Sequence, residues 1–258
     1  MATAIDLNAD AGESYGRWTL GDDERLLPLV TSINAACGLH GGDPATMRRT
    51  VRLARAHGLA IGAHPSYPDL AGFGRRELAA GAQEIADLVT YQLGALAAFC
   101  AAEGVALQHV KPHGALYVRL ARDAEAADAV LAAVRAVDPA LALVVPAGPV
   151  ADALARRGGG DGGARLAREA YVDLDVGDDG IVVVEAAPRR RDPEAVAARA
   201  LDAARGRLQT VGGRLLRTRV DTICIHGDAP GAVDNVHAIR RLFAAEGVEL
   251  RALADVLR

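Results

Sequence analysis

Cysteine is scarce in this sequence, and the few cysteines present define no disulfide framework. The 258 residues include three cysteines, an odd number, whereas disulfide-stabilised secreted domains carry an even set at close spacing. So few cysteines suit a reducing compartment. The first residues lead directly into a strand-like segment, without the basic and then apolar segments of a secretory signal. We therefore expect a cytoplasmic protein.

Long apolar runs and an excess of positive charge are also missing. The most apolar stretch, residues 88–102, is shorter than the roughly 18 residues that a membrane span needs, and it contains Gln92. The net charge is −4, and the 29 basic residues are scattered apart from short clusters such as residues 189–191. We expect neither a membrane nor a nucleic acid as a partner.

Two widespread nucleotide-binding motifs are missing as well. No segment matches the phosphate-binding pattern Gly-x-x-x-x-Gly-Lys-[Ser/Thr], and no Gly-x-Gly-x-x-Gly pattern follows a predicted strand. These absences exclude P-loop and dinucleotide-binding interpretations. Residues 12–16, Gly-Glu-Ser-Tyr-Gly, match the letters of the nucleophile elbow Gly-x-Ser-x-Gly.

The size and composition of the chain favour one folded unit. Hydrophobic residues make up 51% of the sequence, which is too many for a disordered protein. The length of 258 residues is close to the roughly 250 residues of one α/β barrel, and no change in composition marks a boundary. We predict a single domain over residues 1–258.

Residues 34–44 are the most informative segment of the chain. They follow a short β-like run, residues 30–33, and precede a predicted helix, residues 45–57. Asp43 followed by proline is a strong helix start, because the carboxylate caps free N–H groups and proline needs no partner for the one it lacks. His40 therefore lies between a strand and a helix, where α/β proteins place their chemistry. The alternative is a plain turn with a surface histidine.

Four other segments share this pattern, in which an apolar β-type run ends in Asp or His and is followed by Gly or Pro. They are residues 6–13, 62–66, 110–117 and 225–231. Strands that alternate with helices predict parallel βαβ units, and seven or eight units suit a closed barrel better than an open sheet. All strands of a barrel open at one mouth. The residues expected to meet there are Asp10, His40, His64, His113 and Asp228.

The element boundaries follow from apolar periodicity, caps and glycine or proline breaks. The predicted strands are residues 4–9, 30–33, 59–63, 107–110, 141–145, 165–172 and 222–225, with 181–186 as an extra strand or hairpin arm. The predicted helices are residues 22–30, 45–57, 81–103, 123–137, a helix that opens at 148–149, 192–210 and 232–246. Residues 158–163 are expected to form a surface loop, and a short run at 248–253 ends the fold.

The first strand brings polar side chains into the predicted barrel. Alternation places Asp6, Asn8 and Asp10 on one face of that strand. Buried carboxylates so close together are unfavourable unless a cation or hydrogen-bond donors compensate them. Asp10 is therefore a candidate functional carboxylate. The alternative is that Asp10 and Glu13 cap the next helix.

Lys111, Pro112 and His113 form a second candidate motif, because proline restricts the backbone between two functional side chains. The long loop at residues 66–76 has the length of a lid or binding loop, in which Arg75 and Arg76 meet an anionic ligand. The alternative is a solvated arginine pair. His57, His109 and His237 lack such a context and are interpreted as structural or surface residues.

Two kinds of chemistry fit these residues. Asp10, His40 and His64 suit a divalent metal such as zinc with a vacant position for water, although the ligands would come from different strands and form no local metal motif. Without a metal, the same groups act as general acid and base while Lys111 stabilises an oxyanion.

Five stretches together resemble the signature segments of one known family. Residues 6–13, 34–44, 62–74, 111–117 and 226–233 are similar to those of the LamB/YcsF family, whose members are also called lactam utilisation proteins or 5-oxoprolinase A subunits. The resemblance implies an irregular TIM-like barrel related to the glycoside hydrolase and deacetylase superfamily. It also implies ATP-dependent opening of 5-oxo-L-proline to L-glutamate, with the B and C subunits of 5-oxoprolinase as partners. ATP would then be a co-substrate that is handled together with those subunits.

Within this interpretation the site residues fall into two sets. The catalytic candidates are Asp10, Lys111, His113 and Asp228, and the substrate-binding candidates are Asn8, Glu13, Asn34, His226 and Arg75. A five-membered lactam is an unactivated amide, so phosphorylation of its oxygen would supply a leaving group before water attacks. Two other functions stay open: a metal-dependent hydrolase or deacetylase acting on another small lactam or amide, and a non-catalytic subunit that binds a small amide.

One segment departs from the family pattern. Glu169 and Asp173 are kept, but Leu174 stands where the family has arginine and Val176 where it has tyrosine. If that arginine holds substrate or phosphate, this chain acts on another lactam or amide. The alternative is the loss of a structural ion pair.

Overall fold

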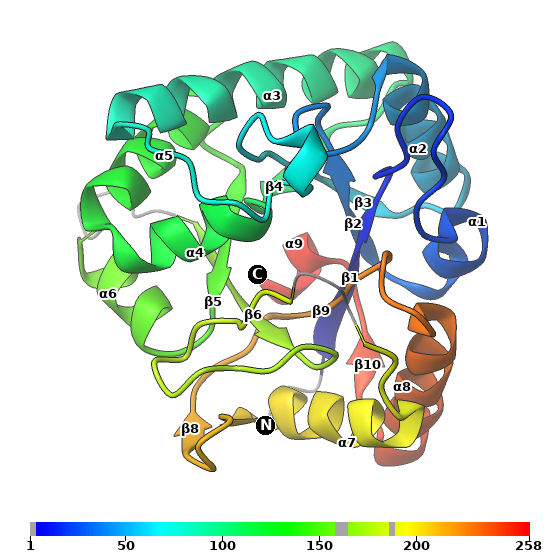
Figure 1. Ribbon diagram of the computed structural model, residues 1–258. Helices are drawn as coiled ribbons and strands as arrows, with labels where there is room; N and C mark the ends of the chain where they lie inside the picture. The colour runs from blue at the N-terminus through cyan, green and yellow to red at the C-terminus, as the bar shows by residue number, and fades with distance from the viewer. Residues whose placement is uncertain (1–3, 158–164, 186–188) are drawn as a thin grey trace.

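A closed parallel β-barrel forms the centre of the structure, a computed structural model that describes residues 4–157, 165–185 and 189–258 (Figure 1). Its strands pair in the order β1, β2, β3, β4, β5, β6 and β9, and β9 pairs back onto β1. They are β1 Ala4–Ala11, β2 Ser32–Ala36, β3 Ala60–His64, β4 Leu107–Val110, β5 Ala142–Pro146, β6 Leu166–Tyr171 and β9 Thr222–Ile225. The predicted α/β barrel is confirmed, with seven strands in the closed ring.

Helices surround this barrel on the outside (Figure 1). The helical segments are α1 Asp23–Leu26, η1 Leu27–Leu29, α2 Pro44–Ala56, η2 Leu70–Gly72, α3 Ala82–Ala102, α4 Gly114–Arg122, α5 Ala124–Val137, α6 Pro149–Arg157, α7 Pro193–Ala204, α8 Ala232–Glu246 and α9 Leu253–Val256. The predicted cap of α2 is confirmed, because the Asp43 carboxylate accepts hydrogen bonds from the N–H groups of Ala45 and Thr46. Asp192 caps α7 in the same way, through Glu194 N–H.

Helix α3 is the one helix among the described residues that is long and apolar enough, by length and composition, to cross a membrane. The apolar stretch identified in the sequence, residues 88–102, covers only part of this helix, which starts at Ala82. Ile85, Val89 and Leu93 on its inner face are buried in the core, and the helix lies against α5 outside the barrel. A buried face of this kind is typical of an outer barrel helix.

The interior of the barrel is polar next to β1. The hydroxyl groups of Ser32 and Thr222, on the neighbouring strands β2 and β9, donate hydrogen bonds to the Asp6 carboxylate at 2.7 and 2.5 Å. Burial raises the pKa of Asp6 to about 6, although these hydroxyls lower it. Asn8 donates to Glu169 Oε1 at 3.0 Å and to the Thr222 hydroxyl at 2.6 Å. These bonds form a hydrogen-bonded floor beneath the mouth of the barrel.

Several predicted elements differ from the structure. Helix α4 was not predicted, because residues 111–117 were interpreted only as a site motif. The helix predicted to run to residue 210 ends at Ala204; Gly206 then adopts φ +73°, and the chain turns into a hairpin of β7 (Arg207–Gln209) and β8 (Leu215–Arg217). The final run is divided into β10 (Glu249–Leu250), which pairs with β1, and α9.

Residues 181–186 were expected to form an extra strand or a hairpin arm, and their described part forms the second of these. Val182 makes an antiparallel β-bridge with Val176, and the N–H groups of Gly177 and Val183 donate to the carbonyls of Ile181 and Asp175. Residue 186 and the surface loop expected at residues 158–163 lie outside the described residues.

Candidate active site

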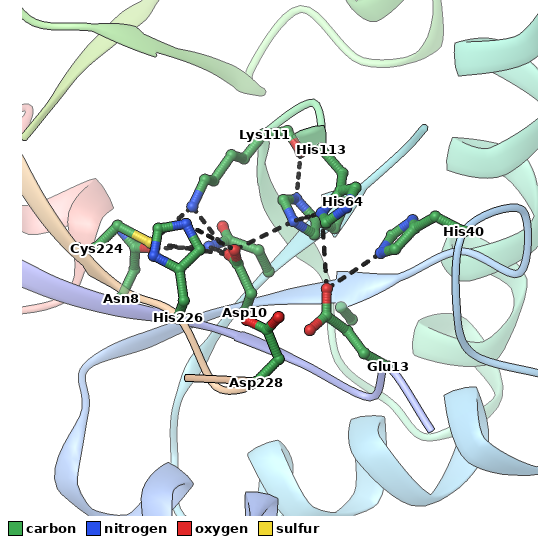
Figure 2. A network of polar contacts seen from close by, with 12 residues as sticks. Asn8, Asp10, Glu13, His40, His64, Lys111, His113, Cys224, His226 and Asp228 are labelled. Carbon is green, nitrogen blue, oxygen red and sulfur yellow. Dashed lines mark hydrogen bonds and ion pairs between the residues drawn. The ribbon is translucent and has the colours of Figure 1, made fainter. Parts of the chain in front are cut away.

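Polar side chains from the carboxyl ends of several strands meet at one mouth of the barrel (Figure 2). The predicted site residues that line its pocket are Asp10, His64, Arg75, Lys111, His113 and His226. Glu13 and His40 lie behind them and remain in contact with His113, while Asp228 lines a neighbouring depression next to the start of α8. The structure therefore brings the predicted residues to one end of the barrel, as parallel strand ends dictate.

Asp10 and Lys111 form a buried ion pair at the centre of this mouth. Lys111 Nζ lies 2.9 Å from Asp10 Oδ1, and the two side chains are 3% and 4% exposed. The ammonium also lies 3.2 Å from Glu169 Oε1 and donates to Cys224 Sγ at 2.8 Å. Lys111 is the only lysine in the sequence. One fixed positive charge is thus held among three groups inside the barrel.

The protonation states of this pair follow from their neighbours. Burial by itself raises the pKa of Asp10, but His64 and Lys111 outweigh it and hold that pKa well below its usual range. Burial acts to lower the pKa of Lys111, yet Asp10 and Cys224 raise it well above its ordinary value. Both groups are therefore charged at neutral pH.

Three histidines and a glutamate form a second cluster beside this pair. The ring of His40 stacks on that of His113 with centroids 3.8 Å apart, and His64 meets both rings edge-on. Glu13 Oε1 lies 3.2 Å from His40 Nε2 and 3.6 Å from His113 Nδ1 (Figure 2). One donor atom from each residue falls within 4.8 Å of the others, so this buried group could hold a metal ion.

Burial governs the titration of this cluster. It lowers the pKa of His40 and of His113 well below 6.5, and the neighbouring histidines add to the effect. Burial also raises the pKa of Glu13 well above its ordinary value, with Asp228 and Asp10 contributing. Without a bound cation, His40 and His113 are therefore neutral at neutral pH, and the ionised form of Glu13 is disfavoured.

His226 differs from His40 and His113 in that its pKa is raised rather than lowered. Its Nδ1 lies 3.0 Å from Asp173 Oδ1, and its backbone N–H donates to Asp173 Oδ2 at 2.8 Å. Burial lowers the pKa of His226, but Asp173 more than compensates and brings it to about 9. Asp173 thereby fixes Nδ1–H and leaves Nε2–H of a charged imidazolium free to face Asp10 Oδ2, at 3.9 Å.

Two predicted substrate-binding residues lie below the pocket rather than in its lining. Asn34 donates to Asn8 Oδ1 at 2.7 Å and to Asp10 Oδ1 at 2.8 Å, and both asparagines are buried. Their position assigns them to the support of Asp10. Arg75 Nη2 lies 2.7 Å from Asp228 Oδ2, so these two predicted residues form an ion pair at the rim. Arg76 pairs with Asp69 instead of facing the pocket.

His109 has the structural role that was one of the two interpretations from the sequence, but its place beneath the site was not predicted. It is buried inside the barrel, and its Nε2 lies 2.8 Å from Asn34 Oδ1. Gly62 makes room for it, because a Cβ at that position would fall 2.1 Å from His109 Nε2. The missed signal was strand alternation, which places His109 and Lys111 on the same inward face of β4.

The same alternation would have identified other site residues that were not predicted. They are Glu169, Tyr171 and Asp173 along β6 and its extension, and Cys224 on β9 before His226. Tyr171 stacks on His226 and lies beneath the Lys111 ammonium, 5.6 Å from it. None of these stood out as a turn residue, which was the feature that guided the sequence reasoning.

The remaining wall of the pocket is mostly apolar, apart from Glu185. Leu174 and Val182 pack with Tyr117 and Tyr171 in one hydrophobic cluster that reaches Cys224. Leu174, where the family pattern has arginine, is 7% exposed and lines the pocket. This wall offers a non-polar contact to a ligand opposite the charged groups.

Comparisons with known proteins agree with this architecture. The model of the LamB/YcsF family matches residues 5–258. The 5-oxoprolinase A subunit of Deinococcus radiodurans is 50% identical over 259 residues, which cover 99% of this chain and 100% of that protein. The 5-oxoprolinase A subunit of Methylococcus capsulatus is 48% identical over 100% of this chain and 98% of that protein.

Solved structures give the same result. The lactam utilization protein of Thermus thermophilus superposes with a TM-score of 0.86 at 46% identity, covering 98% of this chain and 100% of that one. The catalytic domain of a peptidoglycan N-acetylglucosamine deacetylase from Eubacterium rectale has a TM-score of 0.50 at 13% identity, over 98% and 89% of the two chains. At so low an identity the second likeness concerns the fold alone.

Proposed function

The chain belongs to the LamB/YcsF family, and on that premise we propose that it is the A subunit of an ATP-dependent 5-oxoprolinase. In this role it opens the lactam of 5-oxo-L-proline to L-glutamate in the cytoplasm, together with the B and C subunits. The observation that carries the proposal is the identity of 50% over essentially the full length of a protein with that name. The buried Asp10–Lys111 pair at the barrel mouth supports it, because amide opening needs fixed charge next to the carbonyl.

Lys111 and His226 supply the positive charge that the reaction needs. Negative charge develops on the lactam oxygen, or on a phosphate attached to it, and the Lys111 ammonium stabilises that charge. The His226 imidazolium, oriented by Asp173, donates a proton from Nε2 to the leaving nitrogen. Asp10 holds Lys111 through Oδ1 and offers Oδ2 to the attacking water.

ATP enters this scheme as a co-substrate that the partner subunits help to bind. The sequence has no P-loop, which fits a division of labour in which the B and C subunits contribute to binding the ATP phosphates. Phosphorylation of the lactam oxygen by ATP makes the ring carbon a better electrophile. Water adds to that carbon, the C–N bond breaks as the nitrogen takes up a proton, and the resulting acyl phosphate is hydrolysed by a second water to L-glutamate and phosphate. Arg75, which lines the pocket and pairs with Asp228, is the candidate contact for an incoming anionic group.

A second candidate function rests on the histidine cluster. A metal held by His40 and His64 with Asp10 or Glu13 would polarise a carbonyl and activate water, which suits hydrolysis of a small amide without ATP. A third, a non-catalytic subunit that binds a small amide, requires only the pocket.

The deciding experiment measures glutamate release and ATP hydrolysis with 5-oxo-L-proline, for this chain alone and mixed with the B and C subunits. We expect turnover only in the complete mixture, and a loss of roughly a hundredfold or more in Lys111→Met and His226→Gln. His237→Gln, an exposed histidine on α8, is the control. ATP-independent glutamate release by the chain alone would favour the hydrolase. Ligand binding without turnover in every mixture would favour the binding subunit.

A further inference from the structure

The hydrogen bonds of His64 and His113 leave two lone pairs facing each other. His64 Nδ1 lies 2.6 Å from the backbone carbonyl oxygen of Lys111, and His113 Nε2 lies 2.8 Å from that of Phe73. A carbonyl oxygen only accepts, so each of these ring nitrogens must carry the hydrogen. In neutral imidazoles the opposite nitrogens, His64 Nε2 and His113 Nδ1, are then both acceptors, yet they lie 3.0 Å apart.

Two unprotonated nitrogens at this distance repel each other unless a metal ion lies beside them or one of them takes up a proton, for which Asp10 Oδ2, 3.4 Å from His64 Nε2, is the nearby carboxylate. The carboxylate of Glu13 faces the same point, with Oε1 3.6 Å from His113 Nδ1 (Figure 2). His40 Nε2 lies 3.2 Å from the same oxygen, and His40 Nδ1 has no hydrogen-bond partner among the described residues. The contact with Glu13 is thus the one hydrogen bond of the His40 ring among the described residues, and a cation at Glu13 Oε1 would take the place of the shared hydrogen and leave His40 Nε2 as a third nitrogen donor.

From these contacts we propose that Glu13, His40, His64 and His113 bind one divalent transition-metal ion such as zinc, through Glu13 Oε1, His40 Nε2, His64 Nε2 and His113 Nδ1. Metal–nitrogen bonds of about 2.1 Å at tetrahedral angles separate neighbouring donors by roughly 3.4 Å. In the structure His64 Nε2 and His113 Nδ1 are 3.0 Å apart, and Glu13 Oε1 lies 3.2 Å from His40 Nε2 and 3.6 Å from His113 Nδ1, values on both sides of that separation. The carbonyls of Lys111 and Phe73 act as the outer partners that orient metal-binding histidines.

The composition of the site selects the metal class. Three imidazoles and one carboxylate without a thiolate suit zinc, cobalt, nickel or iron, and they suit magnesium and calcium poorly because those ions prefer oxygen donors. The four side chains are buried, so only a small ion with a strong preference for these donors repays their desolvation.

A neighbouring group, Asp10, Cys224 and His226, also places three donor atoms within 4.8 Å of one another. There the cation position is already filled, because the Lys111 ammonium contacts both Asp10 Oδ1 and Cys224 Sγ. Asp10 Oδ1 is therefore engaged by the ammonium, while its Oδ2 lies 3.4 Å from His64 Nε2 at the edge of the histidine cluster. The proposed ligand set keeps His40 and His64 from the sequence-based expectation and has Glu13 and His113 in place of Asp10. The barrel mouth thus holds two adjacent cation sites, one for lysine and one for a metal.

Binding of cobalt(II) to the chelator-treated chain tests this assignment without any assay of turnover. Wild type should take up one ion per chain by elemental analysis and show the strong visible d–d absorption of a tetrahedral site. It should lack a thiolate-to-cobalt charge-transfer band, because no cysteine is a ligand. Zinc added to the apo chain should also raise the melting temperature, since a ligand that binds only the folded state stabilises it.

Variants separate the two donor groups. His113→Gln and Glu13→Gln should each lose the tight site, whereas Cys224→Ser and the exposed His237→Gln should keep the cobalt spectrum of wild type. Absence of stoichiometric metal in wild type, a thiolate band removed by Cys224→Ser, or full binding in folded His113→Gln would each overturn the proposal. Wild-type binding alone decides the matter if the buried variants fail to fold. The result is independent of whether 5-oxo-L-proline is the substrate, because no lactam or ATP is present.

Discussion

Lys111 Nζ lies 2.9 Å from Asp10 Oδ1, across the barrel from β4 to β1, with both side chains nearly inaccessible to water. Glu169 Oε1, at 3.2 Å from the same nitrogen, adds a second carboxylate. A buried ion pair need not increase stability, since desolvation opposes its attraction, but removal of one partner leaves an uncompensated charge. Because this is the only lysine in the chain, its state can be followed with unusual selectivity.

Lysine-directed acylation should leave the folded chain unmodified at Lys111. The side chain is 3% exposed, and its raised pKa keeps it as a non-nucleophilic ammonium at neutral pH. Peptide mapping by mass spectrometry, which separates Lys111 from the N-terminal amine, should find the modification only after denaturation. Modification of the folded chain at a rate near that of the unfolded chain would contradict the buried placement.

Lys111→Met should destabilise the fold by about 3–5 kcal/mol, because Asp10 and Glu169 then lack their buried partner. The double variant Asp10→Asn/Lys111→Met should recover part of this loss and remain inactive. Chemical denaturation measures the free energy of unfolding, and the complete subunit mixture measures turnover. Arg241→Met, which breaks a surface pair with Glu194, is the control and should change little. A stable, active Lys111→Met would remove both the structural and the catalytic role of this lysine.

The sequence determined the parts of this fold that depend on local pattern. The boundaries of β4, β9 and α8 were predicted correctly, because each is an apolar segment between turn residues. The Asp43 cap was predicted because capping is decided within three residues. The convergence of strand ends followed from barrel topology alone.

The division of the site into an ammonium position and a histidine cluster was not accessible from the sequence. It depends on which ring nitrogen of His64 and His113 meets a carbonyl, and these bonds connect residues 47 and 40 positions apart. The sequence left His109 open between a structural and a surface residue, because its inward position depends on the register of β4 beside Gly62.

Gly62→Ala should disturb the site from below. The new methyl group would overlap the imidazole of His109. Burial lowers the pKa of His109 to about 3, so the displaced ring stays neutral and gains no charged hydrogen bond in compensation. We expect a loss of about 1–3 kcal/mol in the free energy of unfolding and a displaced His109–Asn34 contact, seen as shifted imidazole resonances by NMR. Gly94→Ala, in α3, is the matched control because its Cβ meets nothing within 4 Å, and it should be neutral or slightly stabilising. Equal stability of the two variants would show that β3 and β4 adjust freely.

Stability should fall between pH 6.5 and 9 because of His226. Its folded-state pKa of about 9 lies above the ordinary value of 6.5, so its contribution is complete below pH 6.5 and is lost as the pH rises through 9. The difference between the two pKa values corresponds to at most roughly 3 kcal/mol in the free energy of unfolding. Urea denaturation at pH 6.5 and pH 9 should reveal the loss in wild type and its absence in His226→Gln. Above pH 9 buried thiols such as Cys37, with a pKa of about 12, add their own loss, so the comparison stops there.

Leu174 decides whether the departure from the family pattern matters. Its side chain packs against Tyr171 and Val182 in the apolar wall, so an arginine there would place a charge among non-polar groups. We expect Leu174→Arg to destabilise the chain by several kcal/mol and to leave the KM for 5-oxo-L-proline no lower, whereas Leu174→Met should cost less than about 1.5 kcal/mol. Denaturation and steady-state kinetics of the complete mixture measure both effects. If Leu174→Arg instead folds normally and lowers KM for the carboxylate-bearing lactam but not for an uncharged one, the wild-type leucine marks a changed substrate preference, and the pocket of this chain is built for a less anionic amide.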